Sequence, residues 1–190
     1  MVMSTHRTPD RPDENPWVFS TRELARRPGN QRTVTRTVPA PSGDKAIGLV
    51  GVIAVPDGSD VDIDLSLESV TEGVYVSGTA SAHLTGECSR CLDDLSEDVS
   101  ERIEELFAYP DSLTEETTDA DEIPRVGDDN VDLEQTVRDA IAVDLPLAPL
   151  CRPDCPGLCQ ECGERWADLA PDHRHERLDP RWAALRERLT

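Results

Sequence analysis

The feature that most constrains this chain is a run of four cysteines between residues 151 and 163, spaced C-x3-C-x3-C-x2-C and followed by glycine. A further pair, Cys88 and Cys91, forms a second CxxC far upstream. A CxxC turn points two thiolates at one centre, and two such turns make a tetrahedral zinc site. The fold must therefore bring two distant turns together.

The simplest zinc site joins Cys88 and Cys91 to Cys159 and Cys162, as two facing knuckles of a zinc ribbon. In that arrangement the downstream cysteines supply one half of the site and the upstream pair supplies the other half. The metal would then tie the C-terminal part of the chain to the part before it.

A rival site uses Cys151 and Cys155 together with the two cysteines that follow them, because all four lie close in sequence. His173 and His175 add two more ligands, which gives enough donors for two tetrahedral sites. These histidines lie in a loop rich in Pro, Asp and Arg, where a surface position is the simpler interpretation. Some of the thiols could also be free.

A CxxC pair can also act as a dithiol redox catalyst, which is the main alternative function. That function normally needs a CxxC at the N-terminus of a helix in a βαβ unit, and neither CxxC here opens a predicted helix. The chain contains no P-loop, nucleophile elbow, HExxH or Rossmann glycine pattern. We therefore predict a structural zinc site and no enzymatic activity.

Charge is distributed unevenly along the chain. The net charge of −20 argues against a general affinity for nucleic-acid phosphates. Residues 1–36 nevertheless hold seven arginines against four acids, while residues 93–139 hold eighteen acids against three arginines. The first part could contact RNA, whereas the second would repel RNA and attract a basic protein. The candidate RNA or partner contacts are Arg22, Arg26, Arg27, Arg32 and Arg36.

No apolar run resembles a signal peptide or a membrane span. We therefore expect a cytoplasmic protein with no membrane partner. Cysteines stay reduced in that compartment, where CxxC pairs bind metal more often than they form disulfides.

Hydrophobic periodicity predicts an α+β fold, with an antiparallel β-sheet or partly open barrel, a few short helices and a C-terminal zinc-ribbon-like knuckle. The expected parts are a disordered tail (1–15), a β-rich domain with a CxxC hairpin (16–109), an acidic linker (110–130), and a helix, cysteine knuckle and C-terminal helix packed on the β domain (131–190).

Six segments have the alternation or apolar content of strands, and we expect the last two to be joined through the CxxC turn. They are 16–19, 32–38, 47–55, 61–67, 74–84 and 92–107. The last segment also fits a helical period, through Leu92, Leu95, Val99, Ile103 and Leu106, and we choose the strand because it makes Cys88 to Cys91 the tight turn of a hairpin. A capping box from Ser20 to Glu23 predicts a short helix through Arg27. Asp132 is expected to cap a second helix, with Gln135 completing the capping box. The buried stripe expected on that helix is Leu133, Val137, Ala140 and Ile141. Asp179 is expected to cap a last one, whose apolar face is Trp182, Leu185 and Leu189.

Several short motifs, taken in their order along the chain, resemble the YceD family, the large ribosomal RNA subunit accumulation proteins. They are Leu24-Ala25-Arg26-Arg27-Pro28-Gly29, Cys88-Ser89-Arg90-Cys91-Leu92, Leu145-Pro146-Leu147, the cysteine run 151–163, and Asp179-Pro180-Arg181-Trp182. The resemblance covers roughly 17–189. It implies a cytosolic, metal-binding factor that is needed for accumulation of large-subunit ribosomal RNA, with no assigned catalytic residue.

The resemblance and the charge pattern together suggest two kinds of partner. The acidic segment 93–139 would hold an Arg- and Lys-rich large-subunit ribosomal protein before its incorporation. The N-terminal arginines would instead contact ribosomal RNA. No small-molecule substrate is expected.

Overall fold

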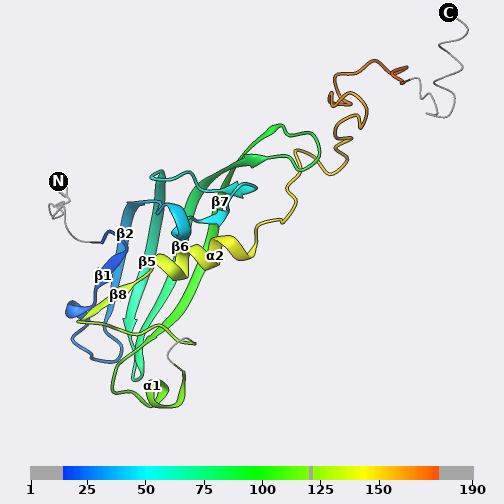
Figure 1. Cartoon of the computed structure of the whole chain (residues 1–190). Helices are drawn as coiled ribbons and strands as arrows, with labels where there is room; N and C mark the ends of the chain where they lie inside the picture. The colour runs from blue at the N-terminus through cyan, green and yellow to red at the C-terminus, as the bar shows by residue number, and fades with distance from the viewer. Residues whose placement is uncertain (1–14, 120–121, 176–190) are drawn as a thin grey trace, which may run out of the picture.

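The computed structural model describes residues 15–119 and 122–175, and its main feature is a six-stranded antiparallel sheet (Figure 1). The long strands lie in the order β2-β5-β6-β7, and two short strands, β4 and β3, continue the sheet beside the far end of β6. Their bounds are β2 (Gln31–Pro39), β3 (Gly48–Leu49), β4 (Ile53–Ala54), β5 (Asp60–Ser69), β6 (Gly73–Glu87) and β7 (Asp94–Ala108). The predicted α+β fold is confirmed, and within the described residues no pairing joins β2 to β7 to close a barrel.

Alternation along β5 explains how the sheet forms. Val61, Ile63 and Leu65 are buried, whereas Asp62 and Asp64 between them are exposed. Because successive side chains of a strand point to opposite faces, this pattern commits one face of the sheet to the core. The four long strands predicted from periodicity are all present, with ends that differ by a few residues.

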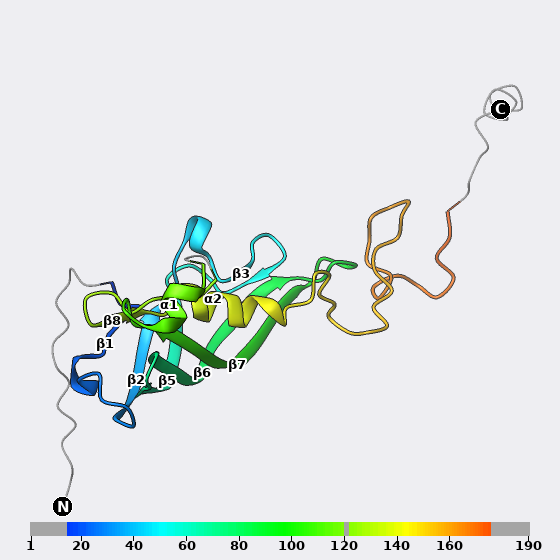
Figure 2. The same ribbon diagram turned by 90° about the horizontal axis from the view of Figure 1, so that it is seen from below.

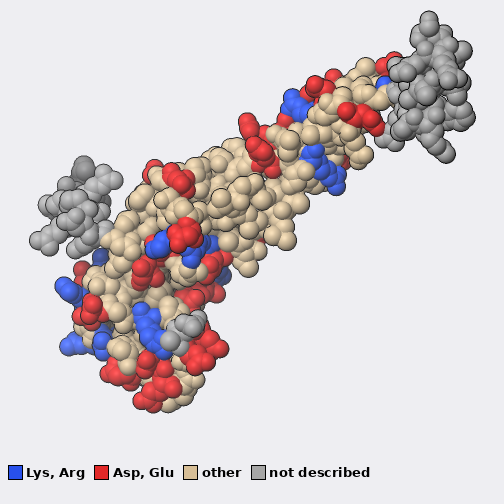
Figure 3. Space-filling view, viewed as in Figure 1, with Lys and Arg blue, Asp and Glu red and all other residues tan. Residues whose placement is uncertain are grey.

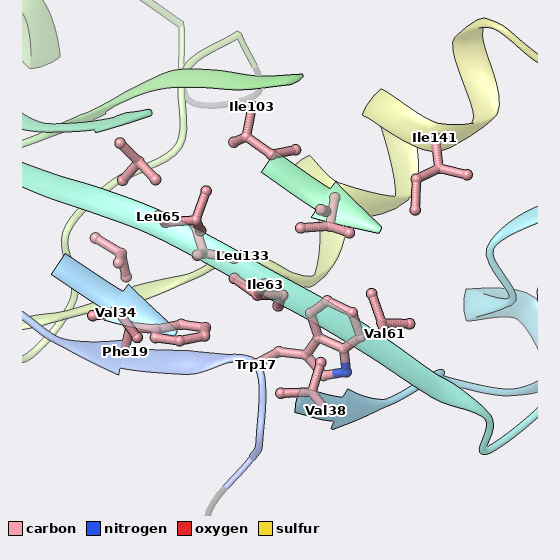
Figure 4. Packing of buried hydrophobic residues seen from close by; sticks show 14 of the residues in the cluster. Trp17, Phe19, Val34, Val38, Val61, Ile63, Leu65, Ile103, Leu133 and Ile141 are labelled. Carbon is pink, nitrogen blue, oxygen red and sulfur yellow. The ribbon is translucent and has the colours of Figure 1, made fainter. Parts of the chain in front are cut away.

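A second layer covers the apolar face of the sheet. It consists of β1 (Val18–Ser20), which pairs antiparallel with β8 (Asn130–Asp132), and of α2 (Glu134–Val143), which follows β8 directly. Figure 2 shows α2 lying across one face of the sheet. Trp17 and Phe19 pack with side chains of β2 and β5, while Leu133 and Ile141 extend the same core toward β7 (Figure 4).

The start of α2 matches the sequence prediction only in part. The Asp132 side chain accepts a hydrogen bond from the Glu134 N–H at 3.0 Å, as expected of a capping residue. Gln135 does not complete a capping box, because its amide donates to the Asp139 carboxylate one turn later. Val137 and Ile141 are fully buried on the predicted apolar stripe.

Two local predictions are wrong. The segment 47–55 is not one continuous strand, because it turns back between β3 and β4 with Gly48 and Gly51 at φ values of 109° and 81°. The helix expected through Arg27 is only the single 3-10 turn η1 (Arg22–Leu24), which ends where Ala25 adopts a left-handed conformation. A second 3-10 turn, η2 (Gly43–Lys45), precedes β3.

The acidic segment 110–130 is more ordered than its composition indicates. It contains α1 (Leu113–Thr117), where Ser112 Oγ accepts the Glu115 N–H at 3.1 Å and Glu72 accepts the Thr114 N–H at 3.0 Å. Val126 is buried in the main core. This stretch therefore packs against the sheet where a solvated linker was expected.

Two further expectations fall largely outside the described residues. These are the tail over 1–15, of which only the last residue is described, and the helix expected from Asp179 with its apolar face. None of the described helices has the length and apolar character needed to cross a membrane.

Candidate metal centres

The predicted CxxC hairpin is present, and its turn joins the end of β6 to the start of β7. The two strands pair as far as Glu87 and Asp94, and residues 88–93 form the turn. The Cys88 N–H donates to the Asp93 carbonyl at 2.8 Å, and Leu92 adopts a positive φ of 60° that reverses the chain. This hydrogen-bonded turn carries both thiols.

Four thiols meet at this tip. Cys88 and Cys91 lie with Cys151 and Cys155, and all four sulfur atoms fall within 4.8 Å of one another. Cys88 Sγ lies 3.7 Å from Cys155 Sγ, and Cys91 Sγ lies 3.6 Å from Cys151 Sγ. Cys151 is exposed, whereas the other three are buried.

The geometry of this cluster fits a tetrahedral zinc ion. Four Zn–S bonds of about 2.3 Å would separate the sulfurs by about 3.8 Å, which is close to the two distances observed. A disulfide would need about 2.05 Å, and all six cysteines are free thiols. The donor set is therefore that of a closed structural site, with four protein ligands and no open position for a substrate.

The electrostatics of the cluster also favour a cation. Burial raises the pKa of Cys88, but backbone N–H groups of Cys151, Arg90 and Cys91 outweigh it and lower that pKa to about 6. Burial and then the hydrogen bond with Cys88 raise the pKa of Cys91 to about 12. One thiol thus ionises readily while its neighbour resists a second negative charge. A divalent cation would remove that repulsion.

Few other contacts join the segment after α2 to the hairpin. The Ser89 N–H donates to the Pro149 carbonyl at 2.8 Å, and Arg90 donates to the Cys155 carbonyl at 3.0 Å. Arg165 pairs with Asp93. Figure 1 shows the cysteine-rich segment continuing past the hairpin tip, away from the sheet.

The remaining two cysteines form a separate cluster with the two histidines. The sulfurs of Cys159 and Cys162 and the Nε2 atoms of His173 and His175 converge within 4.8 Å of one another. Cys159 is buried and Cys162 is exposed. Backbone N–H groups of Cys162 and Glu161 lower the pKa of Cys159 to about 6.

The structure thus groups the cysteines differently from the simplest expectation, which joined Cys88 and Cys91 to the CxxC at 159–162. The chain leaving α2 reaches the hairpin at Pro149, so the first two cysteines of the run are the ones that meet it. The third and fourth lie beyond the tip and have the histidine loop as their neighbour. Sequence spacing alone could not decide this, since every combination of four offered suitable donors.

Three of the five candidate arginines have intramolecular partners. Arg32 donates to the Ser20 carbonyl at 3.2 Å, and Arg36 donates to the carbonyls of Pro16 and Val18 while its guanidinium stacks over the Phe19 ring. These contacts fasten β1 to β2. Arg26 forms an ion pair with Asp111 at 3.4 Å, and its guanidinium lies over the ring of Tyr109. For the exposed side chains of Arg22 and Arg27 no such contact is found within residues 15–119 and 122–175.

Acidic side chains of the segment 93–139 line a groove, whose shape the sequence did not predict. It lies between β7 and α2, has a volume of about 460 Å³, and includes Glu105, Glu122 and Asp139 in its lining. None of these three carboxylates forms an ion pair within the described part of the chain. Figure 3 shows further acidic side chains gathered at the end of the molecule that carries α1.

Comparison with known proteins identifies the family. Residues 76–187 match the family described as "Large ribosomal RNA subunit accumulation protein YceD". The chain belongs to the YceD family. The matched region contains all six cysteines, both histidines of the second cluster and the acidic groove. The description of the YceD family supports a role in ribosome biogenesis.

Individual relatives resemble the chain over different lengths. The uncharacterized protein Rv2926c of Mycobacterium tuberculosis is 49% identical over 175 residues, covering 92% of this chain and 82% of the relative. The uncharacterized protein ML1660 of Mycobacterium leprae is 43% identical over 175 residues, covering 92% and 78%. The uncharacterized protein YlbN of Bacillus subtilis is 28% identical over 112 residues, covering 58% and 63%. No solved structure matches the chain.

Proposed function

We propose that this YceD-family protein is a non-enzymatic, cytoplasmic ribosome-biogenesis factor that binds an Arg- and Lys-rich segment of a large-subunit ribosomal protein. The observation that carries the proposal is the acidic groove between β7 and α2. In this role the protein would neutralise the basic segment until the segment meets ribosomal RNA. A structural zinc ion in the four-cysteine cluster would hold the C-terminal segment at the hairpin tip.

Charge supports the groove as the binding surface. Among the described residues that line the groove, Arg102 is the only basic one, and it already pairs with Glu104 at 2.6 Å. The negative charges of Glu105, Glu122 and Asp139 are therefore not neutralised by an ion pair within the described part of the chain, although Asp139 accepts hydrogen bonds from the Gln135 amide and Glu105 accepts one from the Leu106 N–H. Opposite charges across an interface speed encounter and favour a correctly charged partner. The same charge would repel RNA phosphates, so a cationic protein segment is the ligand that this surface suits.

Direct contact with ribosomal RNA through the arginines is less well supported. Arg26, Arg32 and Arg36 are occupied by intramolecular contacts, which leaves Arg22 and Arg27 as exposed positive charges. All five precede residues 76–187, the part of the chain that matches the family. A thiol redox function is also not favoured, because neither CxxC opens a helix in the described residues.

The test compares two double variants with the same change in charge. Glu105→Gln with Asp139→Asn neutralises the groove, whereas Asp62→Asn with Asp64→Asn neutralises exposed carboxylates on β5. Binding of fluorescently labelled large-subunit ribosomal proteins would be measured by anisotropy. Exposed charge pairs contribute about 0.2–1 kcal/mol each, so loss of two pairs should make the groove variant bind between about two-fold and about thirty-fold more weakly than the β5 control.

Salt and RNA provide the remaining arms of this experiment. Binding should weaken as salt rises, because the Debye length falls below about 10 Å above 0.1 M salt. Equal binding by the two double variants, or binding that salt does not affect, would refute the groove as the site. Tight binding to ribosomal RNA that is lost in an Arg22→Gln, Arg27→Gln variant would instead favour the RNA contact.

A further inference from the structure

We propose that the chain binds a second zinc ion through Cys159, Cys162, His173 and His175, independently of the four-cysteine cluster. The four ligand atoms lie within 4.8 Å of one another. Cys159 Sγ lies 3.2 Å from His175 Nε2, Cys162 Sγ lies 3.6 Å from His173 Nε2, and the two Nε2 atoms are 2.9 Å apart. Zinc with bonds of about 2.3 Å to sulfur and about 2.0–2.1 Å to nitrogen would give about 3.6 Å for S–N and about 3.3 Å for N–N.

Hydrogen bonding alone does not explain why these four atoms converge. Two imidazole nitrogens facing each other can share one proton, since a neutral ring has a single N–H donor. The two thiols that point at the same place are weak donors and weak acceptors. A divalent cation at the centre would satisfy all four groups, because each of them offers a lone pair in its deprotonated form.

The backbone around the cluster is built as a zinc knuckle. The Cys159 N–H donates to the Glu164 carbonyl, and the Gly163 N–H donates back to the Cys159 carbonyl, each at 2.8 Å. Gly163 adopts a positive φ of 76°, which lets the backbone turn tightly after the last cysteine. Leu158 and Arg165 form an antiparallel bridge that closes the loop. All four ligands and the contacts that position them therefore lie between residues 157 and 175.

The histidine loop is held on this knuckle by an aromatic contact. The ring of Trp166 meets the ring of His173 edge-on, with 5.4 Å between centroids. The backbone N–H of Trp166 donates to the Gly157 carbonyl at 3.0 Å. Trp166 is 42% exposed, and its ring contact with His173 places the indole next to a proposed ligand. Its indole is thus a built-in reporter on the metal site.

The ligand set points to zinc and to a structural role. Two thiolates and two imidazoles suit a borderline-soft ion and exclude Mg²⁺ and Ca²⁺, which prefer oxygen ligands. Four protein ligands leave no position for a substrate. The ion would fix residues 157–175 as a compact knuckle beside the first site, whose own ligands come from the hairpin tip and from residues 151 and 155.

Zinc content separates the two sites. After dialysis against a weak chelator, the full chain should retain two zinc ions. Either of two double variants should retain one: His173→Ala with His175→Ala, or Cys88→Ser with Cys91→Ser. A single zinc in the full chain, or two in the histidine variant, would overturn the proposal. Circular dichroism confirms that the sheet is intact in each variant.

A conservative rescue provides the sharper test. His173→Cys with His175→Cys keeps four ligands, so it should restore the second metal. Under cobalt substitution the absorption should then change from that of one four-thiolate site plus one mixed site to that of two four-thiolate sites. Unchanged cobalt absorption in this variant would show that the histidines are not ligands.

Fluorescence of Trp166 reports on the site independently of the metal count. Cobalt added to the metal-free chain should quench indole emission, and a Trp166→Phe variant should lose most of that quenching. Quenching that is equal in the two proteins would contradict a metal beside His173. None of these results depends on ribosomal-protein binding, so failure here leaves the acidic groove hypothesis intact.

Discussion

Removing the metal from the four-cysteine cluster should release the C-terminal segment while the sheet stays folded. The perturbation is chelation of the purified protein under reducing conditions, or the single substitution Cys88→Ser. The residues expected to loosen are 149–175, which reach the sheet mainly through the hairpin tip. The residues expected to stay protected from hydrogen exchange are those of β5 and β6.

The contacts around the four-cysteine cluster show how strongly the C-terminal segment would be held without metal. Without metal, the Ser89–Pro149 and Arg90–Cys155 hydrogen bonds contribute about 1 kcal/mol each, and the exposed Arg165–Asp93 pair contributes at most about 1 kcal/mol. Ordering the backbone from 149 to 155 costs on the order of 1 kcal/mol per residue, or roughly 7 kcal/mol in total. The contacts therefore cannot hold the segment alone. Structural zinc supplies about 10–16 kcal/mol, which reverses the balance.

The stability of the sheet does not depend on whether the C-terminal segment is held at the hairpin tip. The core of the sheet is a separate cluster that includes Ile63, Leu65 and Phe107. Cys88, Cys91 and Cys155 belong instead to a small satellite cluster, against which Leu95 and Leu150 pack. Loss of the satellite cluster removes little buried apolar area from the main core. Stability of the sheet should therefore change by much less than stability of the segment.

Hydrogen exchange followed by mass spectrometry measures both regions in one experiment. Peptides covering 149–175 should exchange much faster after chelation, while peptides of β5 and β6 keep their protection. Restoring zinc should restore the slow exchange, except in Cys88→Ser. Simultaneous loss of protection in the sheet, or no change in 149–175, would refute this account of how the segment is held.

Two further predictions concern the sheet itself. Gly78→Ala should destabilise the fold by about 1–3 kcal/mol or more, because Gly78 has a φ of 150° and an added Cβ would lie 2.2 Å from a carbonyl oxygen of β5. Gly58→Ala is the control in urea unfolding, because Gly58 also has a positive φ, of 72°, but a Cβ added there would meet nothing within 4 Å. An equal loss of unfolding free energy in the two variants would contradict the predicted clash at Gly78. Burial and, second, repulsion from Asp144 raise the pKa of Glu101 in the folded protein. The contribution of Glu101 to folding stability is therefore present in acid, where its carboxyl group is protonated, and is lost as the pH rises through that pKa. Glu101→Gln should therefore raise the urea midpoint at neutral pH and leave it unchanged in acid, and a lower midpoint at neutral pH would show that the carboxylate is stabilising.

Patterns that act over short distances were readable from the sequence. Alternation predicted β2 and β5, and the turn residues around Cys88 and Cys91 predicted the hairpin between β6 and β7. The apolar stripe of α2 and its capping residue Asp132 were also readable. In each case the determining residues are neighbours on one strand, turn or helix, so local sequence carries the information.

Other features depend on packing between distant segments. The apolar run 47–55 looked like one strand, but its glycines allow a turn that lets β4 pair with the end of β6. The acidic segment 110–130 looked solvated, yet Glu72 and Ser112 bind the start of α1 and Val126 fills a place in the core. Net charge and composition describe a segment's average, whereas packing is decided by one or two of its residues.

By itself the sequence determined that six thiols and two histidines were available for metal, that the fold is an antiparallel sheet with short helices, and that an acidic stretch follows the CxxC hairpin. Only the tertiary structure decided how the donors divide, with Cys151 and Cys155 at the hairpin and Cys159 and Cys162 beside the histidines. The physical reason is that zinc ligation requires donors a few ångströms apart. The path of the chain from α2 to Pro149 sets which donors come that close.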